Sequence, residues 1–62
     1  MIGTVWKHLK TGHAYTIMGV CRLEATNRPA ILYRRADGSS QIVWARDEEE
    51  FLDGRFERVE VG

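Results

Sequence analysis

The sequence has one cysteine and one proline, and it has no apolar run of the length that crosses a membrane. Because Cys21 has no partner within the chain, an intramolecular disulfide is excluded and a reducing, cytoplasmic setting is expected. The N-terminus lacks the apolar core of a signal peptide, so we expect neither export nor membrane insertion. Since the chain also lacks any low-complexity tract, residues 1–62 are predicted to form a single small β domain.

Several kinds of functional motif are also missing. The six glycines occur singly, so the chain has no glycine-rich loop for phosphate. One cysteine and two histidines fall short of the paired ligands that structural zinc sites use. Cys21 ends an apolar segment, and the acidic residues 48–50 are typical of a solvated helix face. We therefore predict no catalytic residue, no metal and no cofactor, and a protein that is not an enzyme.

Charge is balanced overall but segregated along the chain. Through residue 46 the sequence carries seven basic and two acidic residues, whereas from Asp47 onward it carries seven acidic and two basic ones. This division suits a basic surface that binds an anion, and it suits equally well neutralisation within the fold or across a subunit contact. Seven of the nine cations are arginine, whose planar guanidinium binds carboxylate or phosphate bidentately and stacks on rings.

The segment around Asp37-Gly38 is predicted to be a hairpin. A type I′ turn needs positive φ at both central positions, which Asp and Gly tolerate, and a two-residue loop of this type fixes the register of the strands. That register opposes Ile31 to Trp44, Tyr33 to Ile42 and Arg35 to Ser40 on one face. The face carries aromatic rings bordered by arginines, which suits a planar or anionic ligand, although the same rings also suit a core.

A second hairpin is predicted where Thr11-Gly12 joins a strand at residues 4–9 to one at residues 14–21. A two-residue loop there pairs Trp6 with Ile17, His8 with Tyr15 and Lys10 with His13. Residues 22–29 are then expected to form a polar connection with Asn27-Arg28-Pro29 as its turn, because the residue before proline is extended and proline cannot donate to a ladder.

Residues 47–54 are predicted to form a short helical turn with Asp47 as its N-cap. Phe51 and Leu52 are expected to close one end of the core, and Phe56 is expected to anchor a weak last strand at residues 56–61. Five short strands with one helical turn predict a mainly β fold, either a small SH3-like antiparallel barrel or a strongly bent sheet.

Four segments carry a family resemblance. The pattern aromatic-x-His-x-Lys-x-Gly occupies residues 6–12, a tyrosine at residue 15 begins an apolar strand, an apolar run ends at Tyr33, and Trp44-Ala45-Arg46 precedes a turn with Phe51. In this order and spacing the chain resembles the DUF1653 family of small bacterial and phage proteins. Asp47 stands where the family often has proline. The resemblance implies a mainly β fold and a phage or bacterial setting in the host cytoplasm, and it implies no enzyme class.

Three binding functions remain, and we prefer the sequestration or sensing of a small anionic, nucleotide-like ligand. The predicted site combines rings that stack a base with cations that pair phosphates, namely Trp6, His8, Lys10, Tyr15, Arg35, Trp44 and Arg46. So small a chain encloses a pocket more readily at a subunit boundary, so a homo-oligomer is expected. In a phage protein such a binder would blunt a host defence signal, by analogy only.

Two alternatives come from other classes. One is a protein-interaction module whose SH3-like groove receives an extended peptide at Trp44 and Tyr33. The other is a weak single-strand nucleic-acid binder, against which zero net charge and only two lysines count. The role of Arg46 is also open, because it either pairs a ligand phosphate or bridges Asp53 or Glu50 to hold the helical turn.

Overall fold

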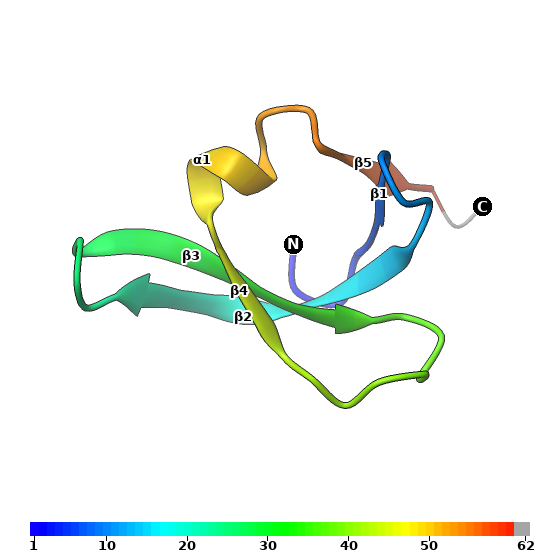
Figure 1. Ribbon diagram of the computed structural model, residues 1–62, viewed down its shortest axis with the longest axis horizontal. Coiled ribbons are helices and arrows are strands. Elements are labelled where there is room, and N and C mark those ends of the chain that lie inside the picture. The colour runs from blue at the N-terminus through cyan, green and yellow to red at the C-terminus, as the bar shows by residue number, and fades with distance from the viewer. Residues whose placement is uncertain (61–62) are drawn as a thin grey trace.

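The computed structural model describes residues 1–60 and shows one curved antiparallel sheet with a short helix over one face (Figure 1). The strands are β1 (Val5–His8), β2 (Ala14–Leu23), β3 (Arg28–Arg35), β4 (Trp44–Asp47) and β5 (Phe56–Val59), and α1 (Glu48–Phe51) follows β4 directly. The order in the sheet is β4-β3-β2-β1-β5. Within residues 1–60 the sheet is open, so the mainly β prediction is confirmed in its bent-sheet form.

Both hairpin registers differ by two residues from those predicted. Tyr33 faces Trp44 rather than Ile42, and Trp6 faces Tyr15 rather than Ile17. Among residues 1–60, Asn27 is the only non-glycine residue with positive φ, so neither Asp37 nor Thr11 adopts the type I′ geometry. Because side chains alternate with a period of two, a shift of two residues leaves each side chain on the face that the sequence predicts.

Local hydrogen bonds explain the longer loops. The N–H of Gly12 donates to the His8 carbonyl (2.7 Å) and the N–H of His8 donates to the His13 carbonyl (2.8 Å), which closes a four-residue loop. In the other hairpin, the Asp37 carboxylate accepts from the N–H of Ser39 (2.9 Å) and from Arg35 (2.9 Å). The Asp37 side chain thus satisfies loop groups that a ladder would otherwise pair. The Ser39 hydroxyl and N–H lower the pKa of Asp37 to about 2.

The connection between β2 and β3 is shorter than predicted. Arg22 faces Pro29 and Leu23 faces Arg28, so the ends of the expected connection belong to the strands. The chain reverses at Asn27, whose φ is +56° and whose N–H donates to the Leu23 carbonyl (2.7 Å). Pro29 fits β3 because the β4 ladder begins only at the next residue, Ala30.

The core is a cluster of aromatic rings between the sheet and α1. Phe51, on α1, is fully buried and stacks on Phe56 of β5 with ring centroids 4.2 Å apart. Tyr33 lies against both rings, at 5.3 and 5.6 Å. Ile17 and Ile31 complete the buried floor. The prediction that Phe51 and Phe56 are core residues is confirmed, whereas Leu52 is 50% exposed because it follows the last helical residue and turns outward.

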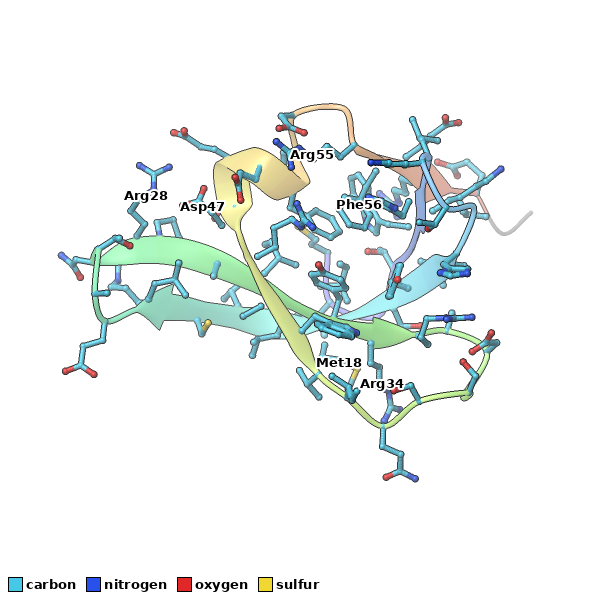
Figure 2. All side chains as sticks on the ribbon, in the orientation of Figure 1. Met18, Arg28, Arg34, Asp47, Arg55 and Phe56 are labelled. Carbon is cyan, nitrogen blue, oxygen red and sulfur yellow. The ribbon has the colours of Figure 1, made fainter. Side chains whose placement is uncertain are left out.

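The helix is fixed at its start by Asp47. Its carboxylate accepts from the N–H of Glu49 (2.9 Å), which confirms the predicted N-cap. Arg28 on β3 pairs with Asp47 and with Glu49 (3.0 Å), and Figure 2 shows Arg28 and Asp47 side by side at one end of the sheet. The Arg28 guanidinium, aided by the Glu49 N–H, lowers the pKa of Asp47. No helix in the described part of the chain is long and apolar enough to span a membrane.

Candidate functional site

A shallow hollow of about 210 Å³ opens at the end of the aromatic cluster that α1 leaves uncovered. It receives one or two side chains from each of the five strands and one from the loop after β1, and we call it the aromatic hollow. Its lining consists of His8, Thr11, Tyr15, Tyr33, Trp44, Arg46 and Phe56. Curvature of the sheet brings these residues together, because β4 and β5 are opposite edges in the strand order.

The rings of the aromatic hollow form a floor and a rim. Tyr33 and Phe56 are buried and make the floor. Tyr15 is half-buried and meets Tyr33 edge to face at 5.2 Å. Trp44 is 47% exposed at the rim. A planar ring entering from solvent therefore meets an exposed indole beside a fixed aromatic floor.

Arg46 is held in place by aromatic partners. Its Nε donates to the Tyr33 hydroxyl (3.3 Å), and its guanidinium carbon lies 5.6 Å from the centroid of the Phe56 ring. The hydrogen bond to Tyr33 is the main cause that raises the pKa of Arg46. Within residues 1–60, no carboxylate comes within ion-pair distance of Arg46, so the bridge to Asp53 or Glu50, one of the two alternatives for this residue, is not formed.

A second hollow, of about 410 Å³, adjoins the first. His8, Lys10, Arg46 and Arg55 line it, and we call it the cationic hollow. His8 and Arg46 belong to both hollows. Figure 2 shows Arg55 in the segment between α1 and β5, next to Phe56. Three side chains of fixed positive charge thus surround one opening, which favours an anion.

His8 joins the two hollows. Its ring lies 4.9 Å from that of Phe56, and its Nδ1 is 3.0 Å from the Thr11 hydroxyl oxygen. The cross-strand pair of His8 with Phe56 in β1 and β5 sets this position. The contact with Thr11 leaves the other ring nitrogen, Nε2, for a ligand.

Five of the seven predicted site residues line a hollow. The aromatic hollow contains His8, Tyr15, Trp44 and Arg46, and the cationic hollow contains Lys10. Trp6 lies elsewhere, because its ring packs edge to face on Phe51 at 5.3 Å and its Nε1 donates to the Thr4 hydroxyl (2.9 Å). Arg35 also lines neither hollow. Its guanidinium pairs with Asp37, and its buried Nε has no hydrogen-bond partner in the described part of the chain.

Sequence reasoning missed Thr11, Arg55 and the role of Phe56 in the site. The N–H of Leu9 donates to the Arg55 carbonyl (3.0 Å), which brings the first and last strands together and carries Arg55 to the hollow. This pairing joins segments far apart in the chain, and local alternation contains no signal for it. The sequence predicts Thr11 in a two-residue turn, whereas the four-residue loop places its hydroxyl beside His8.

The segregated charges meet within the fold at one place. Arg28 is the only basic residue of the first 46 that forms an ion pair with the acidic part, as far as residues 1–60 show. The other pairs, Arg35 with Asp37 and Arg55 with Asp53, are local. No group of three or more His, Cys, Asp or Glu side chains converges in the described part of the chain.

Comparison with protein families gives one match. Residues 4–61, nearly the whole chain, match the model described as "Protein of unknown function (DUF1653)". The chain belongs to the DUF1653 family. No curated protein and no solved structure matches it. The DUF1653 family has no assigned function, so membership in it assigns none to this chain.

Proposed function

We propose that this protein binds, without chemical conversion, a small anionic ligand that carries a planar ring, such as a nucleotide. The observation that supports the proposal is that the aromatic and cationic hollows share His8 and Arg46. A nucleotide has the same division, a ring at one end and phosphate at the other. One ligand can therefore contact both hollows at once.

The aromatic hollow fits a single ring system better than a large ligand. Its volume of about 210 Å³ is below the range of roughly 300–1,000 Å³ typical of pockets that surround a drug-sized molecule. Trp44 offers a half-exposed ring for stacking, Tyr15 also lines the hollow, and Phe56 belongs to its floor. We infer that a base inserts beside Trp44 while the rest of the ligand extends to the cationic hollow.

The cationic hollow suits phosphate because its arginines hold free donors. Arg46 and Arg55 use Nε for Tyr33 and Asp53, and their terminal nitrogens make no hydrogen bond within residues 1–60. A guanidinium oriented through Nε keeps two parallel N–H groups for a bidentate contact. Lys10 adds a third cation at the same opening.

The lining favours binding over catalysis. His8 is the one imidazole among the side chains that line the two hollows. Its hydrogen bond to Thr11 brings a hydroxyl beside an imidazole, but among residues 1–60 no carboxylate orients that imidazole, as activation of a hydroxyl nucleophile requires. Cys21 lines neither hollow. A protein that only removes its ligand from solution needs no catalytic groups. Removal of this kind would be sufficient for a phage protein to blunt a host signal.

A thermal-shift series with mono-, di- and cyclic nucleotides tests this function. A ligand at about 100 times its Kd stabilises the native state by about 2.7 kcal/mol, which raises the Tm of so small a domain by about 10 °C or more. A nucleoside lacks the phosphate and ribose 5-phosphate lacks the base, so each should give a much smaller shift.

Lys10→Ala provides the discriminating variant, because Lys10 is exposed and its side chain forms no ion pair within residues 1–60. It should keep the Tm of the free protein and reduce the shift that nucleotides cause. Arg34→Ala, an exposed cation outside both hollows, is the matched control and should retain the full shift. A wild type that no nucleotide stabilises would remove the proposal, and stabilisation by oligonucleotides alone would move the assignment to single-strand nucleic acid.

A further inference from the structure

The cations of the cationic hollow come from two separate parts of the fold. Arg46 lies on β4, at one edge of the sheet, and lines the aromatic hollow as well. Lys10 and Arg55 lie where β1 pairs with β5 toward the other edge, and they line the cationic hollow alone. The hydrogen bond from the N–H of Leu9 to the Arg55 carbonyl (3.0 Å) brings these two segments together. The cationic hollow therefore has one cation beside the aromatic rings and a pair of cations farther from them, which we call the far pair.

From this arrangement we propose that the ligand carries two linked phosphates, of which a nucleoside diphosphate is the simplest example, an inference that rests on the proposed function. A base in the aromatic hollow places the first phosphate at Arg46, because this side chain lies where the two hollows meet. The second phosphate then reaches Lys10 and Arg55. Each phosphate has its own cationic group, whereas a monophosphate held at Arg46 leaves the far pair without an anion.

The volumes of the two hollows agree with this division of the ligand. The cationic hollow, at about 410 Å³, is nearly twice as large as the aromatic hollow, at about 210 Å³. A phosphate has fewer heavy atoms than a nucleobase, so a single phosphate would leave most of the larger hollow to water. A ribose at the junction and two phosphates beyond it use the larger volume more fully.

The far pair keeps both charge and donors for a phosphate. The Asp53 carboxylate accepts from the Nε of Arg55 (3.0 Å) and from its backbone N–H (3.2 Å), which orients the guanidinium and offsets one positive charge. Within residues 1–60, the terminal nitrogens of Arg55 make no hydrogen bond and Lys10 forms no ion pair. Lys10 therefore supplies an uncompensated charge, and Arg55 supplies the parallel N–H groups that a phosphate accepts from.

Calorimetric titration with the mono- and diphosphates of adenosine, guanosine, cytidine and uridine, without divalent cations, tests this inference. For the base that binds most tightly, the Kd of the diphosphate should be about tenfold or more below that of the monophosphate, because a further charge-assisted contact forms. The 3′,5′-bisphosphate of the same nucleoside carries two phosphates that are not linked, and it should bind no more tightly than the monophosphate.

Equal Kd values for the mono- and diphosphate would overturn the inference and leave the proposed function in place. A 3′,5′-bisphosphate that binds as tightly as the diphosphate would also overturn it, because total charge rather than two linked phosphates would then set the affinity. A chain that binds none of these nucleotides would remove both the inference and the proposed function.

Lys10→Ala separates the two phosphate positions. It should raise the Kd of the diphosphate about tenfold and that of the monophosphate less than about twofold, because the monophosphate ends at Arg46. Arg55→Ala repeats the test at the other member of the far pair, and Lys10→Ala decides alone should loss of the Asp53 contact impair folding. The matched control is Arg34→Ala, an exposed cation that lines neither hollow, and it should change neither Kd. Equal losses for both ligands in Lys10→Ala, or no loss for either, would overturn the inference.

Discussion

The aromatic cluster has two ends that share their residue chemistry and differ in cover. At the covered end, α1 packs on β3 and β4 and brings Phe51 to zero exposure against Trp6 and Phe56. At the open end, Trp44 and Tyr15 border a hollow beside Arg46. Phe56 and Tyr33 belong to both ends. The comparison teaches that ring chemistry alone does not separate core from site, because one turn of helix determines which rings meet solvent.

The largest effect should come from Phe51→Ala at the covered end. Truncating a fully buried phenylalanine costs about 3–5 kcal/mol, which is a large part of the stability of any small domain. We expect a chain that is largely unfolded near room temperature, measured by urea titration of the circular dichroism signal. The neighbouring Leu52→Ala is the control and should change stability by less than about 0.5 kcal/mol, because Leu52 is half exposed. Equal losses would show that α1 does not cover the cluster as described.

A smaller effect should follow from Asp47→Ala, which removes the cap that holds the cover. We expect the Tm to fall by several degrees at neutral pH, because the Glu49 N–H loses its acceptor and Arg28 loses one of its two carboxylate partners. Asp47→Asn retains an oxygen for the cap but loses the ion pair, so its Tm should lie between that of the wild type and that of Asp47→Ala. An unchanged Tm in Asp47→Ala would contradict the capping role.

The same carboxylate gives a pH dependence. The folded-state pKa of Asp47 is lowered, so the native chain holds its charge more firmly than an unfolded chain, whose Asp pKa is about 3.9. Its stabilising contribution is full above that value and is lost as pH falls through the lower folded pKa. Wild-type Tm should therefore decrease below about pH 4, and the decrease should be shallower in Asp47→Ala. Asp37, with a pKa of about 2, adds to the decrease in both chains.

A smaller effect on stability than that of Phe51→Ala or Asp47→Ala is expected for Trp44→Ala at the open end. Because the indole is 47% exposed, its loss should cost less than about 1 kcal/mol. The ligand-induced rise in Tm should nevertheless disappear if a base stacks there. A thermal-shift assay of the variant with and without nucleotide makes the measurement. A variant that keeps the full ligand shift would place the ring elsewhere and separate the hollow from the proposed function.

Much of the fold follows from local patterns in the sequence. Alternation placed the strands, and Asp47 before an acidic run placed the helix, because both signals depend on near neighbours. The registers were wrong by two residues, because Asp37 and Thr11 use their side chains on local groups instead of adopting positive φ. The adjacency of Phe51 and Leu52 could not show which one is buried, since that depends on where the helix ends.

The candidate site was less accessible to sequence reasoning than the fold. His8, Tyr15, Trp44 and Arg46 were identified because each lies on an aromatic or basic face of a strand. Trp6 lies on the same face as His8 but two residues nearer the covered end, and no pattern within β1 distinguishes the two positions. Arg55 reaches the hollow only through the β1 and β5 pairing, a long-range contact that no short window contains.

The positions of the two tryptophans have a spectroscopic consequence. Trp6 rests on the ring of Phe51, whereas Trp44 stands at the rim in contact with water. The indole emission of Trp6 therefore reports whether the rings remain assembled, and that of Trp44 reports what occupies the rim. Replacing either indole with phenylalanine leaves a single tryptophan, so unfolding and occupancy can be followed separately through indole emission, without any added label.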